Sequence, residues 1–451
     1  MANSYLVRTP SSAGNRKTFT LSTWVKRSKM SYDYAYMITA GEYNSDQMGQ
    51  FKFDASDNLN FSGYASNGSK DFRLHTNRVF RDPNAWYHVM VAVDTTQSTA
   101  ADRVKMYVNG EQETSFAEAT YPSQNHDTAF NLNGIQSNIG VRAGSGIFFE
   151  GSMSHVAIVD GAALAPTVFG QTDSTSGIWK FKAPSGVTWG TNGVHLKFEN
   201  SANLGLDSSG QTNNYTVNGN LKQSIDTPTT AYTTLNPLTH DSGGAKTYSN
   251  QNTTVSETAD SWTTAHTGMM VTKGKWYFES KITYSNNQEA YVGACSQRTI
   301  NERITNSHYL GQTTGSVGYY TNGGTYYKGA GAVSYGNSVS GGDIVGCALD
   351  LDNNFIYFSI NGTWQNSGDP TSGASGTNGI SLPSGMTSAG LKEISFSVSP
   401  NQSTHQCNFG NGLFGTTPIS SAGSNGNGAV FEYDVPSGYY AMNTKNLNTY
   451  G

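Results

Sequence analysis

Hydrophobic and polar side chains alternate with a period of two along many stretches of this chain. The alternation is clear in residues 18–25, 104–108 and 355–360, and it is typical of a strand with one buried face. A longer apolar run at residues 86–93 predicts a strand in the middle of a β-sandwich. The pattern therefore predicts a protein built mainly from strands.

Turn signals divide these strands. Asn109-Gly110 and Asn361-Gly362 each follow an alternating stretch, and Asn-Gly predicts a tight hairpin because both residues tolerate a positive φ. No helix longer than about two turns is expected. The best short candidate is residues 162–169, and Pro166 interrupts it.

The strand-rich stretches form two groups. We expect one unit at residues 1–180, a turn-rich bridging segment at 181–244 and a second unit at 245–415. The tail, residues 416–451, begins rich in Gly and Ser and then becomes aromatic. A flexible end would not need these aromatic side chains, so we expect the tail to pack on the second unit or on a neighbouring subunit.

Composition supports an all-β fold and excludes other classes. Of 451 residues, 13% are charged, 12% are aromatic and 51 are glycine. Disorder needs few aromatic residues and a high charge density, and helical bundles need Ala, Glu, Lys, Leu and Arg to dominate. The formal net charge of -5 disfavours nucleic-acid binding, which relies on a basic surface.

The chain shows no membrane or secretion signal. No window approaches the ~20 apolar residues that a membrane-spanning helix needs, and the N-terminus lacks the basic start and apolar stretch of a secretory signal. Cys295, Cys347 and Cys407 are too few and too widely spaced for a disulfide framework or a zinc site. We therefore expect synthesis in a cytoplasm and no membrane insertion.

The first unit resembles a laminin-G-like domain of the concanavalin A type. The resemblance rests on motifs in the family's order, at residues 19–25, 86–89, 104–110, 139–140 and 149–158. It implies a jelly-roll β-sandwich.

The second unit resembles a SPRY domain, which is also a bent β-sandwich. The matching motifs are residues 274–282, 291–294, 317–320, 342–350, 356–362, 396–399 and 408–410. Together the two resemblances predict an all-β chain with two tandem sandwiches.

The order of the parts is similar to that of tail-fibre and related virion proteins of marine bacteriophages. The bridge at residues 227–238 and the ending at 433–439 extend this resemblance over the whole chain. It implies a protein that is located in the virion and meets the host surface, without saying whether it belongs to the tail or the capsid.

Catalytic motifs are missing. Glycoside hydrolases of this fold need two carboxylates that face each other across the sugar, and no such spacing is present: Glu150 and Glu279 stand alone, and Asp350 and Asp352 are typical of turn capping. No serine-hydrolase elbow or phosphate-binding loop is present either. We expect a protein that is not an enzyme.

The sequence predicts no cofactor, although the laminin-G resemblance admits calcium. Such domains often hold Ca²⁺ at the rim of the sandwich with oxygen ligands, and the candidate ligands are Asp54, Asp57, Asp94 and Asp102. Asp54 and Asp57 are equally explained by a turn between strands. The nine histidines are scattered, and those inside strand motifs, His88 and His155, are expected to be structural.

Aromatic residues flanked by Asn and Gly are the candidate ligand-binding residues, because sugar C–H faces stack on rings. The candidates are Tyr319, Tyr320, Asn322, Tyr326, Tyr327 and Trp364 in the second unit, and Tyr32 and Tyr34 in the first. The alternative is that these aromatics pack across strands or at an oligomer interface. Trp24, Trp86, Trp276 and Phe278 are expected in the cores.

The leading hypothesis is a non-enzymatic virion protein that mediates adhesion by binding a host cell-surface glycan. It would also contact other virion subunits, as a homo-oligomer or in many copies. The alternatives are a structural capsid decoration or tail connector, a glycan depolymerase, which the missing acid pair disfavours, and a secreted lectin, which the missing signal disfavours.

Overall fold

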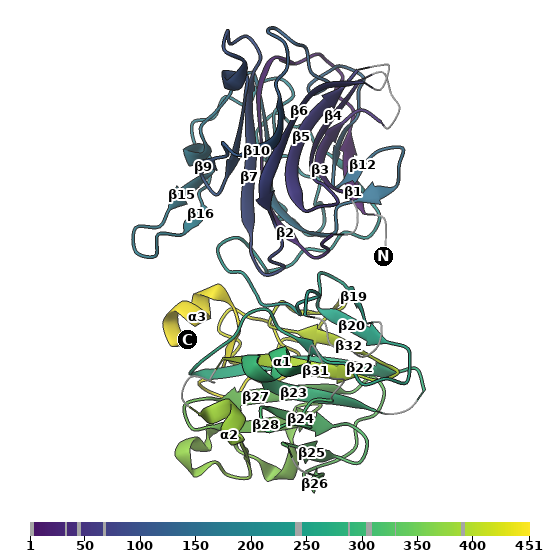
Figure 1. Ribbon diagram of the computed structural model, residues 1–451, viewed down its shortest axis with the longest axis vertical. Helices are drawn as coiled ribbons and strands as arrows, with labels where there is room; N and C mark the ends of the chain where they lie inside the picture. The colour runs from purple at the N-terminus through teal and green to yellow at the C-terminus, as the bar shows by residue number, and fades with distance from the viewer. Residues whose placement is uncertain are drawn as a thin grey trace. The chain divides into compact units, whose positions relative to one another are not determined.

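A computed structural model of the chain describes residues 4–31, 34–42, 47–65, 69–239, 246–286, 289–303, 309–329, 331–388 and 393–451. The chain divides into two compact units, Met1–Gln223 (unit 1) and Ser224–Gly451 (unit 2), which are coloured purple to teal and teal to yellow in Figure 1. Strands make up 42% of the structure and helices 7%. The prediction of an all-β chain with two tandem β-sandwiches is confirmed.

Unit 1 contains an eight-stranded antiparallel sheet and a six-stranded antiparallel sheet. In spatial order, the larger sheet consists of β10 (Phe116–Thr120), β6 (Lys70–Val79), β5 (Asn58–Tyr64), β4 (Met48–Phe53), β3 (Ala35–Ala40), β11 (Ser137–Ile139), β1 (Tyr5–Arg8) and β18 (Thr216–Asn218). The smaller sheet consists of β17 (Val194–Leu196), β14 (Gly151–Asp160), β2 (Thr18–Arg27), β7 (Tyr87–Asp94), β8 (Val104–Val108) and β9 (Glu111–Gln112). Figure 1 shows β3 to β6 side by side in the larger, curved sheet.

Short elements complete unit 1. Two hairpins pair β12 (Val141–Arg142) with β13 (Ile147–Phe148), and β15 (Gly170–Thr172) with β16 (Trp179–Phe181). Two 3₁₀ turns span Ala100–Asp102 and Pro166–Val168. The second lies within the predicted short helix at 162–169, and Pro166 occupies its first turn, where a missing N–H costs nothing.

The core of unit 1 follows from the period-two pattern. Phe51, Phe53 and Phe61 of the larger sheet meet Leu21 and Val91 of the smaller sheet, and all five are fully buried. Because successive side chains of a strand point to opposite faces, the residues between these phenylalanines lie on the outer face of the larger sheet.

Unit 2 also contains two sheets, which are antiparallel except where β35 joins the larger one. The larger runs β19 (Thr247–Ser249), β20 (Thr254–Glu257), β32 (Ser403–Asn408), β22 (Lys275–Tyr284), β27 (Ile344–Asp350), β28 (Phe355–Ile360) and β29 (Thr363–Trp364), with β30 (Ile380–Ser381) on β28 and β35 (Tyr440–Ala441) parallel to β22. The smaller runs β21 (Ala265–His266), β31 (Ile394–Pro400), β23 (Ala290–Ser296), β24 (Ser316–Tyr320), β25 (Thr325–Tyr327) and β26 (Val333–Ser334).

The remaining elements of unit 2 are short. They are the pair β33 (Leu413–Phe414) and β34 (Thr417–Pro418), helices α1 (Gln297–Arg303), α2 (Ser384–Thr387) and α3 (Thr444–Tyr450), and 3₁₀ turns at Gln365–Ser367 and Pro370–Ser375. The longest described helices, α1 and α3, have seven residues each, so no described helix spans a membrane.

Both predicted Asn-Gly hairpins are present. Asn109 and Gly110 have φ values of 49° and 83° and connect β8 to β9, and Asn361 and Gly362 have φ values of 48° and 79° and connect β28 to β29. The expected core residues are also confirmed, because Trp24, Trp86, Trp276 and Phe278 are all buried.

The segment predicted to bridge the two units, residues 181–244, is divided between them. Residues 181–223 belong to unit 1, where β17 pairs with β14 and β18 pairs with β1. Residues from Ser224 onward belong to unit 2, where Tyr232 and Leu235 are buried. The aromatic tail packs within unit 2, since Phe431, Val435 and Tyr439 are buried against Tyr277 and Tyr357.

Candidate functional site

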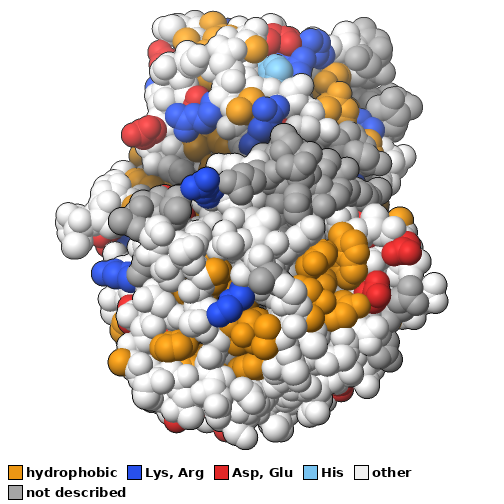
Figure 2. Space-filling model, turned by 60° about the horizontal axis from the view of Figure 1, so that its bottom comes forward, with side chains coloured by type: hydrophobic (Ala, Val, Ile, Leu, Met, Phe, Trp, Pro, Cys, Tyr) orange, Lys and Arg blue, Asp and Glu red, His pale blue; other side chains and the backbone are white. Residues whose placement is uncertain are grey.

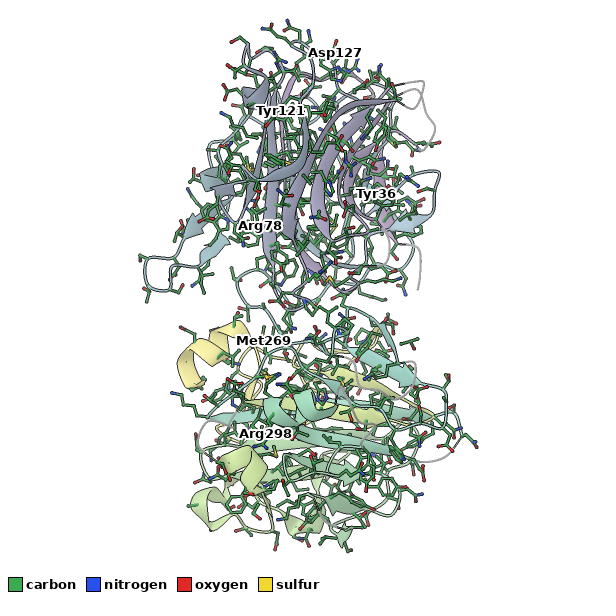
Figure 3. All side chains as sticks on the ribbon, viewed as in Figure 1. Tyr36, Arg78, Tyr121, Asp127, Met269 and Arg298 are labelled. Atoms are coloured by element: carbon green, nitrogen blue, oxygen red, sulfur yellow. The ribbon has the colours of Figure 1, made fainter. Side chains whose placement is uncertain are left out.

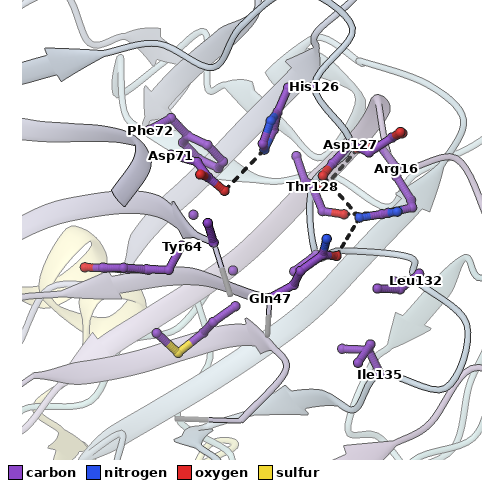
Figure 4. A pocket seen from close by; sticks show the side chains of 15 residues that line it. Arg16, Gln47, Tyr64, Asp71, Phe72, His126, Asp127, Thr128, Leu132 and Ile135 are labelled. Atoms are coloured by element: carbon purple, nitrogen blue, oxygen red, sulfur yellow. Dashed lines mark hydrogen bonds and ion pairs between the residues drawn. The ribbon is translucent and has the colours of Figure 1, made fainter. Parts of the chain in front are cut away.

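A pocket of about 660 Å³ opens at one end of the unit 1 sandwich. It lies where β4 begins, where β5 ends and beside the start of β6, and residues 126–135 between β10 and β11 close it. Figure 4 shows Gln47, Tyr64, Asp71, His126 and Arg16 around it. Segments that are far apart in the sequence therefore form one cavity.

Arg16 fixes one wall of this pocket. Its Nε donates to the carbonyl oxygen of Thr128 at 2.7 Å, and its Nη2 donates to Gln47 Oε1 at 2.7 Å and to the carbonyl oxygen of Asp127 at 3.1 Å. A planar guanidinium holds several acceptors in fixed directions. Arg16 thereby ties the 126–135 loop to the start of β4.

Asp71 and His126 form the opposite wall. Asp71 Oδ2 lies 3.8 Å from His126 Nε2, as Figure 4 shows, and the His126 ring meets the Phe72 ring edge to face with centroids 5.8 Å apart. Both side chains are half-buried. This wall offers a carboxylate and an imidazole to a polar ligand.

The pocket floor is apolar, and two glycines make room for it. A Cβ atom at Gly49 would lie 2.4 Å from Phe130, and one at Gly63 would lie 2.3 Å from Phe72. Any residue larger than glycine at either position would displace the neighbouring ring. Met48, Leu132 and Ile135 complete the lining. A polar rim over an apolar floor suits a small ligand with both hydroxyl and C–H surfaces.

Sequence reasoning did not find this pocket. Its polar residues, Arg16, Gln47, Asp71 and His126, come from four separate segments and form no motif. Strand alternation places Phe72 in the core, but only the sheet order brings Asp71 beside the loop that carries His126.

The β24–β25 hairpin places the predicted tyrosines of unit 2 on two opposite faces of its sheet. Tyr319 pairs with Tyr326 across the hairpin, and both rings pack on the core of the unit. Tyr319 is fully buried and donates its hydroxyl hydrogen to the carbonyl oxygen of Asn337. It is a core residue, which corrects its assignment as a ligand-binding residue. Tyr320 and Tyr327 lie on the opposite face.

Tyr320 and Tyr327 join three aromatics that the sequence analysis did not single out. The rings of Trp262, Tyr291, Tyr309, Tyr320 and Tyr327 form what we call the aromatic cluster. Tyr291 lies at its centre and stacks on Tyr309 and Tyr320, with centroids 4.9 and 4.8 Å away. Tyr320 also donates its hydroxyl hydrogen to Glu289 Oε1 at 3.0 Å. Four of the five rings are half-buried and Tyr291 is buried.

The remaining aromatic candidates are dispersed. Trp364 packs beside Tyr277 at 6.5 Å, on the opposite sheet of unit 2 from the aromatic cluster, and Asn322 is exposed in the β24–β25 turn. In unit 1, the Tyr34 side chain is 38% exposed, and Tyr32 lies outside the described residues. Of the candidates that lie in the described residues, only Tyr320 and Tyr327 come together on one outer face.

The candidate calcium ligands are engaged with protein groups. Asp57 is fully buried between Arg27 at 2.9 Å and Arg81 at 2.7 Å. Burial alone would raise the pKa of Asp57, but hydrogen bonds from Ser31 and Arg81 and the charge of Arg27 outweigh it and lower that pKa. Its role is an internal ion pair, which a sequence pattern cannot distinguish from a metal ligand.

Asp54, Asp94 and Asp102 occupy separate turns. Asp54 contacts His75 at 2.6 Å and caps its own turn, Asp94 accepts hydrogen bonds from Thr96 and Gln97, and Asp102 pairs with Lys105 at 3.1 Å. Among the described residues, no three His, Cys, Asp or Glu side chains gather in a metal-binding group.

Two family profiles match this chain. The profile described as the concanavalin A-like lectin/glucanases superfamily matches residues 2–169, and the SPRY domain profile matches residues 275–378. The chain carries a concanavalin A-like (ConA-like) domain followed by a SPRY domain. The pocket lies within the ConA-like match, and four of the five rings of the aromatic cluster lie within the SPRY match, with Trp262 before it.

Similar proteins share parts of this chain. A stretch of 92 residues, 20% of the chain, is 35% identical to the dual specificity protein kinase splA of Dictyostelium discoideum, of which it spans 3%. The solved SPRY domain of human HERC1 is 14% identical, with 38% of this chain and 94% of that one covered and a TM-score of 0.28. A Bacteroides ovatus structure named "putative carbohydrate binding protein" is 17% identical, with 50% and 59% covered and a TM-score of 0.30.

Proposed function

We propose that this chain is a non-enzymatic adhesion protein that binds carbohydrate in the pocket of its ConA-like domain. The observation that supports it is the pocket itself, in a domain that matches a lectin and glucanase superfamily. Tyr64 offers a ring to the C–H face of a sugar, and Gln47, Asp71 and His126 offer hydrogen bonds to its hydroxyls.

Mutation of the pocket tests this proposal. The full chain is applied to immobilised glycans, and bound protein is measured for the native chain, Gln47→Ala and Tyr64→Ala. Each loss of a sugar contact should weaken binding about fivefold to tenfold, as one hydrogen bond is worth about 1 kcal/mol. Gln112→Ala, an exposed change on β9, is the matched control. The proposal would be contradicted if the native chain bound none of the glycans, or if all variants bound as strongly as the native chain.

The absence of catalysis is part of the proposal, and the pocket makes it testable. Asp71 and Asp127 both line the pocket, and two carboxylates about 5–9.5 Å apart across a sugar are what a glycoside hydrolase uses. We expect no new reducing ends when the chain is incubated with glycans that it retains. Release of reducing ends that Asp71→Asn abolishes would instead establish a depolymerase.

The setting that we propose is a bacteriophage particle, on the resemblance of the domain order to tail-fibre-type virion proteins. Single-site sugar binding is typically weak, and many copies on one particle would make attachment strong. Excess purified chain should then slow the attachment of particles to host cells. If attachment is unchanged while the chain itself is retained on those cells, the adhesion role stands and the virion setting fails.

A structural role is the second candidate, and the aromatic cluster favours it. Figure 2 shows hydrophobic side chains gathered in patches on one face of unit 2. Half-buried rings such as Trp262 and Tyr309 are typical of the centre of protein interfaces. Under this alternative, Tyr327→Ser should shift the chain from oligomer to monomer in light scattering and leave glycan binding unchanged.

A further inference from the structure

Four polar oxygen atoms in one corner of unit 2 are buried without hydrogen-bond partners. They are Glu257 Oε2, Ser261 Oγ, Asn401 Oδ1 and Gln402 Oε1. The corner lies where β20 ends beside the turn between β31 and β32, since Glu257 pairs with Ser403 across β20 and β32. Buried polar atoms almost always have a partner, because leaving them unpaired is costly. The unpaired oxygens therefore indicate that this corner lacks a donor or a cation.

The Asn401 side chain is aimed between two carboxylates of this corner. It is 1% exposed, and its Nδ2 donates to Asp260 Oδ1 at 3.1 Å and to Glu289 Oε2 at 3.3 Å. Its Oδ1, at the other end of the same amide, is the atom without a partner. Asp260 is exposed and Glu289 is half-buried, so an ion from solvent reaches this pair of carboxylates directly.

The carboxylates of this corner have no cationic partner in the part of the chain that the structure describes. No described lysine or arginine forms an ion pair with Glu257, Asp260 or Glu289, and Lys246 Nζ donates to a backbone carbonyl oxygen instead. Arg298, labelled in Figure 3, belongs to α1, which follows the opposite end of β23 from Glu289. The result is a local excess of negative charge, which a bound cation would offset.

We propose that Asp260, Glu289 and Asn401 form a site for a calcium ion. Ca²⁺ takes about six to eight oxygen ligands, which include carboxylates, amides and water, in irregular geometry. A half-turn of the Asn401 amide exchanges its nitrogen for its unpaired oxygen, so that three separate segments present oxygens to the ion. Water completes the shell at the exposed side of Asp260. Two carboxylates and one amide differ from the groups of three acids, histidines or cysteines that the described residues lack.

The proposed site lies next to the aromatic cluster. Tyr320 donates its hydroxyl hydrogen to Glu289 Oε1 at 3.0 Å, and Trp262 follows Asp260 by two residues. The rings of Trp262 and Tyr320 have centroids 6.4 Å apart. An ion held by the two carboxylates is therefore close to aromatic rings, which provides a spectroscopic signal for its binding. The site does not depend on carbohydrate binding in unit 1.

Terbium luminescence of the full chain tests the proposal. Tb³⁺ prefers oxygen ligands as Ca²⁺ does, and it emits when an excited tryptophan or tyrosine lies near it. The chain is titrated with Tb³⁺, and the bound ion is then displaced with Ca²⁺ or Mg²⁺. Asp260→Asn and Glu289→Gln each remove one charged ligand. Glu393→Gln, a change at an exposed acid of unit 2, is the matched control.

We expect Ca²⁺ to displace Tb³⁺ with a Kd of about 0.1–1 mM, and Mg²⁺ to do so more weakly because it demands regular octahedral geometry. Asp260→Asn and Glu289→Gln should each lower the calcium affinity about tenfold or more. Equal displacement by both ions, with the same dependence on Asp260, would support the cation site and add magnesium to its ligands. The proposal would be overturned by absence of Tb³⁺ emission, or by emission and displacement that are the same in both variants and the control.

Asn401→Asp distinguishes a metal ligand from a structural amide. Without metal, this change removes two hydrogen bonds and adds a third carboxylate beside the other two, so the melting temperature should fall. With Ca²⁺, the added charge makes a stronger ligand, so calcium should restore the melting temperature and bind more tightly than to the native chain. A fall that calcium does not reverse would count against the site. Asp260→Asn and Glu289→Gln add no charge, so they decide the question if Asn401→Asp does not fold.

Discussion

At the scale of single residues, three histidines, two of them buried and one half-buried, illustrate how neutral polar groups are built into unit 1. Trp179 Nε1 of β16 donates to His88 Nδ1 at 3.1 Å, and the Phe181 ring of the same strand stacks on His155 at 3.6 Å. His195 stacks on Trp189 at 5.4 Å. The β15–β16 hairpin thus attaches to the domain through rings that must stay uncharged, which agrees with the structural role expected for His88 and His155.

Acid should therefore destabilise unit 1. Burial lowers the pKa of His88 to about 3 and those of His155 and His195 to about 4. Because the unfolded chain binds protons at an ordinary histidine pKa of about 6.5, stability is lost as the pH falls below that value, by up to about 1.4 kcal/mol per pH unit for each histidine. We expect amide exchange in β15 and β16, corrected for its intrinsic pH dependence, to rise between pH 6.5 and 4.5.

A matched variant identifies the histidines as the cause. His155→Gln cannot take up a proton, so its stability should depend less on pH than that of the native chain. Gln171→Ala, an exposed change on β15 that alters no titratable group, should leave the dependence unchanged. A native profile that is flat from pH 6.5 to 4.5 would refute this account.

At the scale of elements, the C-terminal tail is held by a single buried carboxylate. Glu279 of β22 is fully buried, and it accepts hydrogen bonds from the backbone N–H groups of Glu432 and Tyr433, both at 2.9 Å. Tyr277 and Asn408 donate to the same carboxylate. The sequence analysis found Glu279 to be an isolated acid on a strand; the structure makes it the anchor of the tail.

Removal of this anchor should loosen the tail. Glu279→Ala leaves the two half-buried backbone N–H groups without their acceptor, which should cost about 2–5 kcal/mol of stability and raise amide exchange in residues 430–441. Glu393→Ala, an exposed change in unit 2, is the control. Unchanged exchange in the tail would show that the apolar contacts of Phe431 and Tyr439 suffice.

The same carboxylate gives unit 2 a pH dependence of opposite sign. Burial raises the pKa of Glu279 to about 7 from its ordinary 4.5, although the hydrogen bonds from Glu432 and Tyr433 oppose this rise. A raised pKa in the folded state contributes stability that is fully present below the unfolded value and is lost as the pH rises through about 7. The tail should therefore be held less firmly at alkaline pH.

At the scale of the whole molecule, each unit has its own hydrophobic core and its own pair of sheets. We expect residues 1–223 and 224–451 to fold when they are produced separately, each with a cooperative thermal transition. Residues 1–180 should fail this test, because they lack β17, whose Val194 and Leu196 are fully buried. Equal stability of the 1–180 and 1–223 fragments would show that the boundary lies at the earlier position.

The local pattern was sufficient to predict strands β2, β7, β8 and β28 and the two Asn-Gly hairpins. Alternation reports which face of a strand is buried, and the need for a positive φ at Asn109 and Gly110 is a property of four or five consecutive residues. The sequence pattern also identified Trp24, Trp86 and Trp276 as core residues. These predictions need no knowledge of which strands are neighbours.

The candidate site could not be predicted in this way. Tyr319 and Tyr320 are adjacent and chemically identical, and only the direction of the hairpin makes one a core residue and the other part of the aromatic cluster. Asp57 was interpreted as a turn residue or calcium ligand because its partner Arg27 lies 30 positions away. Residues that pair over long distances leave no local signal.

The sequence by itself determined that this is a β protein with two strand-rich units, because period-two burial and turn chemistry act over a few neighbouring residues. The two family resemblances added that each unit is a sandwich. Only the tertiary structure decided which polar groups meet, such as Arg16 with Gln47 and Glu279 with the tail. These pairs depend on strand order and register, which are set by the packing of whole sheets.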